Sequence, residues 1–323
     1  SISFDYSRTM GIRLDTGSRM NDIFLAFGDS FTWGHGLQYY DWIKNSKMSK
    51  EEIKDFLLED QQSLHHQWAN FDFKCSAADL ESMRKRRYTT LLSKELGMDY
   101  ISRINNGGSN FANTHMIKTL LGDDYPDNKS RWKKANHSLN NDKLMNRKIK
   151  FIILQLTDLE RDYKSTKELR VHAGELEHVR SMIGSWWDTY VMSTERGGIF
   201  NPNKKSIQVL RPFEHRDAYK YHQLLDKVTE LYEICKKKDI KLYVWAWPGD
   251  IGQVFLSQPY FVEIEYDNKK YGSYDNLTNS YPKFSLGKKG GDLEEYGVTD
   301  EHPSEHFHKL ISKILLNKIN GDK

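Results

Sequence analysis

Four short apolar runs, separated by longer amphipathic stretches, dominate the hydropathy pattern of the chain. These runs are rich in β-branched and aromatic residues, and they cover Ile23–Phe27, Asp99–Ile104, Phe151–Leu156 and Lys241–Trp247. Runs of this length without strict polar alternation are typical of strands buried on both faces of a parallel sheet. Strands alternating with helical segments predict an α/β fold.

Helical spacing of apolar residues marks the connecting segments. We expect helices over Asp79–Leu96, about Phe111–Leu121, about Glu175–Met192 and Glu214–Lys238, and after Pro303. Gly97 is placed to end the first of these helices, because glycine commonly ends helices in a left-handed conformation.

Several connections are longer than a crossover requires. We therefore expect one domain over residues 1–323, with insertions at about 37–78, 122–148, 165–213 and 250–297. Phe255–Tyr296 is aromatic and polar, with a strand-like piece at Tyr260–Tyr266. We expect this region to form a lid or rim rather than core.

Composition narrows the class of protein. A hydrophobic fraction of 38% over 323 residues is enough for a substantial core. The 48 Lys and Arg nearly balance the 45 Asp and Glu, so the net charge of +3 does not favour nucleic acid as a partner.

Cysteine usage and apolar run length exclude further classes. Cys75 and Cys235 are far apart and form no CxxC motif, so neither a disulfide framework nor a zinc site is indicated. The longest apolar runs are strand-sized, and the first twenty residues carry no charged-then-apolar secretion pattern. We expect neither a membrane span nor a signal peptide.

The candidate nucleophile is Ser30. The first apolar run ends abruptly in Gly28-Asp29-Ser30, the pattern of a strand that delivers a small nucleophile to a sheet edge. Gly28 allows a sharp turn, Asp29 can cap the helix that follows, and that helix's first N–H groups can face developing negative charge. By itself the tripeptide is also ordinary turn chemistry, which is the commoner origin of such a tripeptide.

Two later stretches carry complementary chemistry. Asp300 and His302 stand just before Pro303 and an apolar-periodic run, which puts His302 on a loop at a helix start, where Asp300 can orient its imidazole. After the second run, the amide of Gly107 can point at an oxyanion, although a plain glycine loop fits the same residues.

Together these stretches resemble the motif blocks of the SGNH (GDSL-type) hydrolase superfamily. The matching segments are GDSFTWG at residues 28–34, Asn105-x-Gly107-x-Ser109, and DEHPSEHFHKLI at residues 300–311. The resemblance implies a three-layer α/β/α sandwich of flavodoxin-like topology, with a central parallel sheet of about five strands and helical and irregular insertions. It also implies Ser30 as nucleophile, His302 as base, Asp300 as its partner, and the amides of Ser30 and Gly107 as oxyanion donors. No metal or organic cofactor is needed.

The third block departs from the family pattern. Where the family has Gly-x-Asn-Asp, this chain has Gln155-Leu156-Thr157-Asp158. The Thr157 hydroxyl is a shorter donor than an asparagine amide, and losing one oxyanion donor costs about 10²- to 10³-fold in rate. Gln155 and Arg161 are candidates to replace Thr157 as the oxyanion donor.

The candidate oxyanion and substrate set is therefore Gly107, Thr157, Asp29, Asn105, Gln155 and Arg161. Asp300 also lies two residues before His302, where three is the commoner family spacing.

Two functions remain open. The first is a serine esterase or deacetylase acting on an acylated substrate that we expect to be a carbohydrate, with an O-acyltransferase as a lesser variant. The second is a binding or structural protein with a weakened site. GDSFTWG and Thr157–Arg161 also resemble SGNH-like proteins of bacteriophages. That likeness allows a virion-associated role, with assembly into a larger particle. Because we expect no signal peptide or membrane span, we expect a cytoplasmic or virion-associated location.

Other motifs give weaker alternatives. His302, His306 and His308 invite a metal site, but on a helix His302 and His306 share a face that His308 does not. Gly34-His35-Gly36 lacks the spacing of a nucleotide-binding loop. Five tryptophans are core residues by default, and those near strand ends could form a platform for a sugar ring: Trp33, Trp186, Trp187, Trp245 and Trp247.

Overall fold

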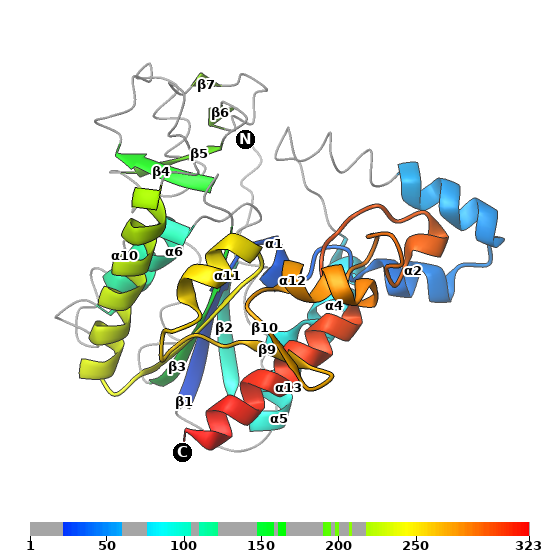
Figure 1. Ribbon diagram of the computed structural model, residues 1–323. Helices are drawn as coiled ribbons and strands as arrows, with labels where there is room; N and C mark the ends of the chain where they lie inside the picture. Colours follow the sequence, from blue (N-terminus) through cyan, green and yellow to red (C-terminus); the bar gives the residue numbers. More distant parts are fainter. Residues whose placement is uncertain are drawn as a thin grey trace, which may run out of the picture.

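A four-stranded parallel sheet forms the centre of the protein (Figure 1). The computed structural model describes residues 22–59, 76–104, 110–121, 147–157, 161–165, 190–194, 198–199, 207–208 and 218–322. The strands of the sheet are β1 (Asp22–Gly28), β2 (Asp99–Ile104), β3 (Lys148–Leu156) and β8 (Lys241–Ala246). All four apolar runs of the sequence are therefore strands, and the α/β fold is confirmed.

The strand order places the functional edge of the sheet. The order is β2-β1-β3-β8, and all neighbours are parallel. The chain thus winds outward from β1 to β2 and then crosses back to β3, as in flavodoxin-like folds. In such sheets ligands bind outside the carboxyl ends of the strands at the point of reversal, which here lies between β1 and β3.

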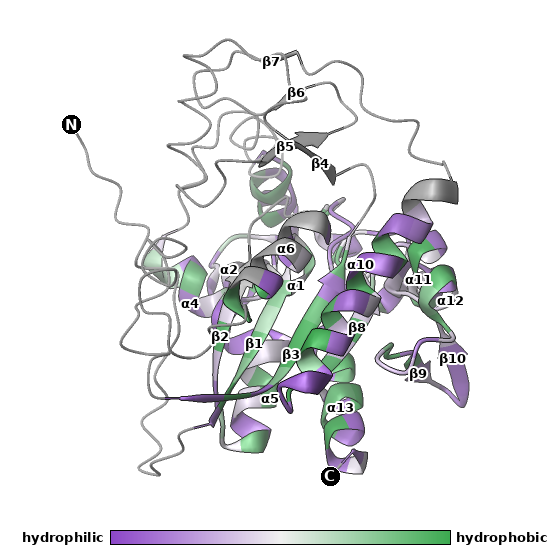
Figure 2. Cartoon of the chain, turned by 90° about the vertical axis from the view of Figure 1, so that its left-hand side faces the viewer, coloured by the Kyte–Doolittle hydropathy of each residue, from purple (hydrophilic) through white to green (hydrophobic). Residues whose placement is uncertain are grey.

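Helices cover both faces of the sheet, which makes three layers (Figures 1 and 2). One face carries α6 (Asn110–Leu120), α10 (Ala218–Lys237) and α11 (Gly249–Phe255). The other carries α5 (Tyr88–Leu96), α12 (Tyr274–Ser280) and α13 (Glu305–Gly321). Alternate residues of β1 serve the two cores, because successive side chains of a strand point to opposite faces: Ile23 and Leu25 on one side, Phe24 and Ala26 on the other.

The remaining elements are short. Helical ones are α1 (Ser30–Trp33), α2 (Tyr39–Asn45), a helix of residues 50–59, α4 (Ala77–Arg86), η3 (Pro282–Phe284) and η4 (Glu294–Tyr296). The described residues also form antiparallel pairs, which are β4 (Arg161–Ser165) with β5 (Tyr190–Thr194), β6 (Gly198–Ile199) with β7 (Ile207–Gln208), and β9 (Ile264–Tyr266) with β10 (Lys269–Tyr271). None of the helices among the described residues is both long and apolar enough to cross a membrane.

Two helix predictions need correction. The segment expected as one helix over residues 79–96 is two helices, because Arg87 has an extended backbone (φ −62°, ψ 142°). The expected end at Gly97 is confirmed, with φ at 60°. The helix expected over residues 175–192 lies mostly outside the described residues, and its last three residues, 190–192, belong to β5 instead.

The expectation of a lid or rim over residues 255–296 is wrong for much of that segment. Its large side chains lie in the core, including Tyr260, Phe261, Tyr274, Leu277 and Phe284. The backbone at residues 260–262 pairs with Val244 of β8 through a parallel bridge. The expected fifth strand is reduced to this bridge in the described part of the chain. Tyrosine accounts for the misleading polarity of the segment, since its ring packs while its hydroxyl keeps a polar partner.

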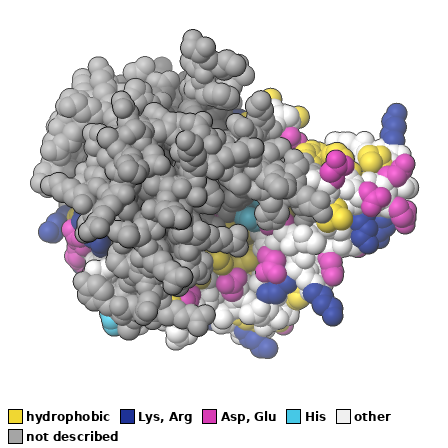
Figure 3. Space-filling model, turned by 90° about the horizontal axis from the view of Figure 1, so that it is seen from above, with side chains coloured by type: hydrophobic (Ala, Val, Ile, Leu, Met, Phe, Trp, Pro, Cys, Tyr) yellow, Lys and Arg dark blue, Asp and Glu magenta, His cyan; other side chains and the backbone are white. Residues whose placement is uncertain are grey.

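A third, smaller core fastens the segment before Asp300. Tyr39, Ile53 and Leu57 pack against Leu286, Leu293 and Val298. The arm formed by α2 and residues 50–59 therefore supports the loop that carries Asp300. Acidic and basic side chains are interspersed over this arm in the view from above (Figure 3).

Candidate active site

The turn after β1 is packed too tightly for any side chain at its first position. An added Cβ at Gly28 would stand 2.4 Å from the Thr32 Oγ1 atom and 2.6 Å from the Gln155 Oε1 atom. The chain therefore turns directly into α1, whose first residue is Ser30. The side chain of Ser30 lies outside the described part of the structure. Its backbone stands at the carboxyl end of β1, beside the point of reversal of the sheet.

Asp29 is fully buried and links the ends of three strands. Its Oδ1 atom accepts from the Phe31 backbone N–H at 2.9 Å, which confirms the predicted cap of α1. Its Oδ2 atom accepts from the Thr157 hydroxyl at 2.7 Å and from the Trp247 indole N–H at 3.2 Å. Thr157 directly follows β3 and Trp247 directly follows β8. The carboxylate therefore holds the strand exits together.

Thr157 and Gln155 direct their hydrogen-bond donors into the protein. The single hydroxyl hydrogen of Thr157 goes to Asp29, and its oxygen accepts from the Trp247 indole at 3.0 Å. The Gln155 amide donates to the Leu156 carbonyl, while its oxygen accepts from the Asp29 backbone and from the Thr32 hydroxyl, both at 3.0 Å. In this geometry the Thr157 hydroxyl hydrogen is bound to Asp29, and the fully buried Gln155 amide places one of its two hydrogens on Leu156. Both side chains thus brace the turn, and their expected roles as oxyanion donors stay predictions.

Asn110 was not expected from the sequence to support this turn. Its side-chain amide donates to the Thr157 carbonyl at 2.6 Å, and its oxygen accepts from the Thr157 N–H at 2.7 Å. This reciprocal pair replaces the backbone partners that Thr157 lacks once it has left the sheet. The only clue in the sequence was the position of Asn110 at the start of a helix.

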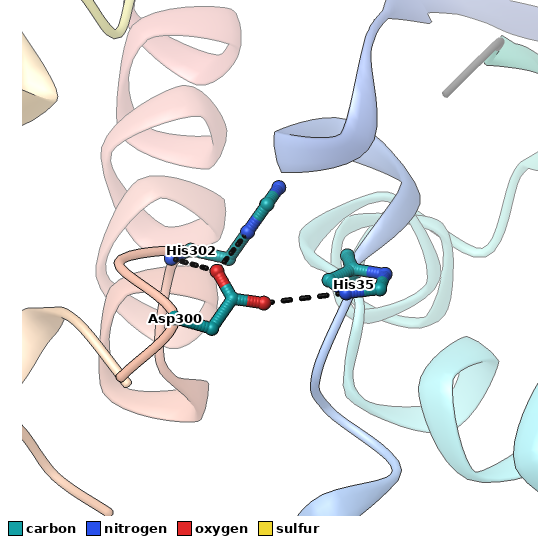
Figure 4. Close-up of side chains that lie close together, drawn as sticks. All are labelled: His35, Asp300 and His302. Atoms are coloured by element: carbon teal, nitrogen blue, oxygen red, sulfur yellow. Dashed lines mark hydrogen bonds and ion pairs between the residues drawn. The ribbon is translucent and has the colours of Figure 1, made fainter. Parts of the chain in front are cut away.

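Asp300 and His302 lie together, as the sequence predicted. Both stand on the loop before α13, which begins at Glu305 after a Ser304 cap. Backbone bonds from Leu286 and Gly287 hold the loop in place. The Asp300 Oδ1 atom is hydrogen-bonded to the Nδ1 atom of His302 and accepts from the His302 backbone N–H at 3.1 Å (Figure 4).

The position of His302 relates it to the turn that carries Ser30. Its ring centroid is 5.0 Å from that of Phe31, the residue after Ser30. Phe31 also stacks on the partly buried Trp247, with centroids 4.8 Å apart and an interplanar angle of 11°. Because Nδ1 faces Asp300, the opposite edge of the ring, with Nε2, is the one that can serve as a base.

A second histidine contacts the same carboxylate. The Nε2 atom of His35 lies 3.2 Å from the Oδ2 atom of Asp300, and the two histidine rings are 4.8 Å apart (Figure 4). His35 is 3% exposed and stands between Gly34 and Gly36, which have φ of 78° and 83°. No pattern in the sequence indicated this contact, since the residues are far apart along the chain.

Asp300 is ionised in this setting. Burial raises the pKa of its carboxyl, but the charge and hydrogen bond of His302, with the hydrogen bond and charge of His35, outweigh that effect and hold the pKa well below its usual range. An ionised carboxylate between two imidazoles can fix a tautomer and stabilise a positive charge that forms on the ring.

Among the described residues, His35, Asp300 and His302 are also close enough to one another to hold a metal ion. Donor atoms of His35, Asp300 and His302 all lie within 4.8 Å of one another. An ion there would have to replace both hydrogen bonds to Asp300. The other histidines considered do not converge on His302: His306 is 3.3 Å from Asp292, and His308 is buried against Tyr88.

Some predicted residues cannot be placed. Asn105 and Gly107 lie outside the described residues, and of Arg161 only the backbone in β4 is described. Their roles stay predictions.

No protein-family model matches the chain, and no curated protein matches it. Solved structures that resemble it include a carbohydrate esterase family 2 enzyme with a carbohydrate-binding domain from Corynascus thermopiles (Myceliophthora fergusii), with 13% identity and a TM-score of 0.37 over 96% of this chain and 68% of that one. An acetyl xylan esterase from the rumen bacterium Butyrivibrio proteoclasticus has 10% identity and a TM-score of 0.41, over 94% and 65%.

A third carbohydrate esterase, whose active site displays divergent catalytic and non-catalytic binding functions, has 13% identity and a TM-score of 0.35, over 94% and 66%. The chain thus spans about two thirds of the length of each. At these identities and TM-scores the likenesses decide neither fold nor function.

Proposed function

We propose that the chain is an SGNH-type serine hydrolase that cleaves carboxylic esters through an acyl-enzyme. The observation that carries the proposal is the Asp300–His302 pair, whose imidazole lies against Phe31, next to Ser30. The pair lies beside the turn after β1 that carries Ser30, at the carboxyl edge of a parallel sheet and near the point where the strand order reverses. A nucleophile, a base and a group that orients the base are the three parts that acyl transfer through serine requires.

In the proposed mechanism the Ser30 hydroxyl oxygen forms a bond to the ester carbonyl carbon, and its proton passes to the Nε2 atom of His302. Asp300 stabilises the imidazolium that forms. The imidazolium then gives the proton to the leaving alkoxide as the carbon–oxygen bond breaks. Water next attacks the acyl-serine by the same route, which releases the acid. The amides of Ser30 and Gly107 are the proposed oxyanion donors, since the Thr157 hydroxyl donates to Asp29 and the Gln155 amide donates to Leu156.

We propose an acylated carbohydrate as the substrate. A partly exposed indole, Trp247, stacks on Phe31 beside His302. A flat aromatic surface next to the base suits a sugar ring, whose apolar face can pack on it. An acceptor sugar in place of water would make the same site an O-acyltransferase.

A binding or structural role is the second candidate. The observation that favours it is that the Thr157 hydroxyl donates to Asp29 and the Gln155 amide to Leu156, which supports a third motif block weakened as an oxyanion donor. Loss of one such donor lowers the rate about 10²- to 10³-fold in a working site.

A serine-directed fluorophosphonate separates the two candidates. Wild type and Ser30→Ala are exposed to the probe at neutral pH, and peptide mass spectrometry locates the adduct. We expect one adduct, on Ser30, that is absent from the variant. A folded wild-type protein that gains no adduct would contradict the hydrolase and favour the binding role.

The substrate class is tested on acetylated xylo-oligosaccharides, with a short-chain aryl acetate as comparison. We expect acetate release from both by wild type and from neither by Ser30→Ala. Release from the aryl ester alone would contradict a carbohydrate substrate. Mass analysis of the sugars, with and without an added unacetylated acceptor, distinguishes hydrolysis from acyl transfer.

A further inference from the structure

We propose that His35 is a positioning residue of the site, which holds the Asp300 carboxylate in the rotamer that faces His302. The inference rests on the proposed function, because it assigns a second histidine to the same catalytic pair. In this proposal His35 acts through Asp300, whose carboxylate it contacts.

The contacts of Asp300 divide between its two oxygens. Oδ1 takes both bonds from His302, one from the ring and one from the backbone. Oδ2 faces the Nε2 atom of His35 at 3.2 Å. Because each oxygen has its own partner, rotation of the carboxylate about its Cβ–Cγ bond would break contacts on both sides. The imidazole of His302 is therefore oriented directly by Asp300, and by His35 through its contact with Asp300.

His35 is itself held in place. It is buried, and it stands in a turn whose flanking glycines both have positive φ, a conformation that favours glycine. An added Cβ at Gly36 would come 2.3 Å from a methyl group of Leu286, on the segment that also binds the backbone of His302. The turn at residues 34–36 thus packs against the segment 286–302, so the position of His35 is coupled to that of Asp300.

Such support matters because small misplacements of catalytic groups are costly. A shift of about 1 Å can lower a rate about 10²-fold. Asp300 comes from a loop rather than from a strand or helix, and groups on loops depend on surrounding contacts for their precision.

Two substitutions at His35 distinguish the effect of its hydrogen bond to Asp300 from the effect of the packing of its ring. His35→Phe keeps the ring volume and loses the donor, whereas His35→Gln keeps an N–H donor near the position of Nε2. His306→Gln, at an exposed histidine of the same region, is the matched control. Thermal unfolding first establishes that each variant is folded.

The first readout is the rate at which the fluorophosphonate modifies Ser30. We expect His35→Phe to react about tenfold more slowly than wild type, and His35→Gln and His306→Gln within about threefold of it. Equal rates for His35→Phe and wild type would overturn the proposal. An equal loss in His35→Phe and His35→Gln would also overturn it, since it would assign His35 to packing alone.

The second readout is the low-field proton NMR signal of the His302–Asp300 hydrogen bond, assigned by its loss in His302→Gln. It does not require a reactive serine. We expect it in wild type and His35→Gln and expect it to broaden or vanish in His35→Phe; a signal unchanged in His35→Phe would overturn the proposal. If wild type gains no adduct while the signal behaves as expected, the proposed hydrolase fails and the positioning role stands.

A third arm tests the metal alternative. Both readouts are repeated after dialysis against EDTA, and we expect no change. A loss of labelling in the EDTA-treated wild type would show that the site depends on a metal ion, with His35, Asp300 and His302 as its candidate ligands, and would overturn the proposal.

Discussion

At the scale of single residues, polar side chains at the strand exits mainly hold the backbone of the turn. Asp29 is fully buried, and it accepts hydrogen bonds from the Phe31 backbone, the Thr157 hydroxyl and the Trp247 indole. A buried carboxylate requires such partners, because its desolvation is otherwise costly. Sequence motifs identified Asp29, Asp300 and His302, whereas His35 escaped notice because its role depends on a contact across the chain.

Gly28 is the residue at which this dense packing is most easily tested. We expect Gly28→Ala to lower the free energy of unfolding by about 1–3 kcal/mol, as overpacking does, and to abolish labelling of Ser30. Gly97→Ala is the control, because a Cβ there meets nothing within 4 Å although φ is 60°. It should cost about 1 kcal/mol of backbone strain and leave labelling intact. Urea unfolding and probe kinetics measure both, and normal labelling of Gly28→Ala would contradict the packing argument.

At the scale of elements, the contact between α5 and α13 explains why one expected helix is two. The Tyr88 N–H donates to the Nδ1 atom of His308 at 3.2 Å, so its partner comes from α13 rather than from its own helix. The rings of these two residues also stack, with an interplanar angle of 12°. Local periodicity contains no information about this acceptor, which explains why the break at Arg87 could not be predicted.

The burial of His308 against Tyr88 makes the free energy of unfolding depend on pH. Burial, followed by the positive charge of Arg87, lowers the pKa of His308 to about 3. An unfolded histidine has a pKa of about 6.5, so below that pH the unfolded state binds a proton that the folded state does not. The stabilising contribution is therefore complete above about pH 6.5 and is lost as the pH falls toward 3. At pH 5 the loss is about 2 kcal/mol.

His308→Asn removes the titration and keeps an acceptor near Nδ1. We expect its free energy of unfolding to fall less steeply than that of wild type between pH 6.5 and pH 4.5. The exposed His306→Asn serves as control and should keep the wild-type slope. Urea unfolding at several pH values gives the slopes, and an unchanged slope for His308→Asn would refute the assignment.

At the scale of the whole molecule, two cores on opposite faces of the sheet have different relations to the site. The core that includes Phe307 continues into α13, which begins just after His302. The core that includes Leu224 lies under α10 on the other face. Burial of apolar side chains stabilises both faces of the sheet. The core that includes Phe307 also anchors the start of α13, and therefore the loop that carries His302.

We therefore expect two buried truncations to differ in function. Phe307→Ala and Leu224→Ala should each lower the free energy of unfolding by about 3–4 kcal/mol, the cost of the lost burial and the cavity. Only Phe307→Ala should also slow the labelling of Ser30, because Phe307 packs against Tyr274 and Trp245 below the loop. Probe kinetics at low temperature, where both variants are folded, make the comparison. Equal slowing in both would show that global stability, not the loop, controls reactivity.

The sequence by itself determined the local features of this protein. Apolar runs predicted all four strands of the central sheet, and helical spacing predicted α6, α10 and α13 to within a few residues, because the periods of strands and helices are properties of neighbouring residues. The capping role of Asp29 and the pairing of Asp300 with His302 were predictable for the same reason, since each acts within two residues of its partner.

Only the tertiary structure decided what depends on contacts between distant segments. Such contacts bury the aromatic residues of the segment 255–296, which was expected to form a lid, and they divide the helix expected over residues 79–96 at Arg87. They also place the Thr157 hydroxyl and the Gln155 amide in hydrogen bonds within the protein. The tertiary structure also placed His35 on Asp300, 265 positions away. The physical reason is that a polar side chain in the interior must find a partner, and the order in which strands and loops come together determines which partner lies within reach.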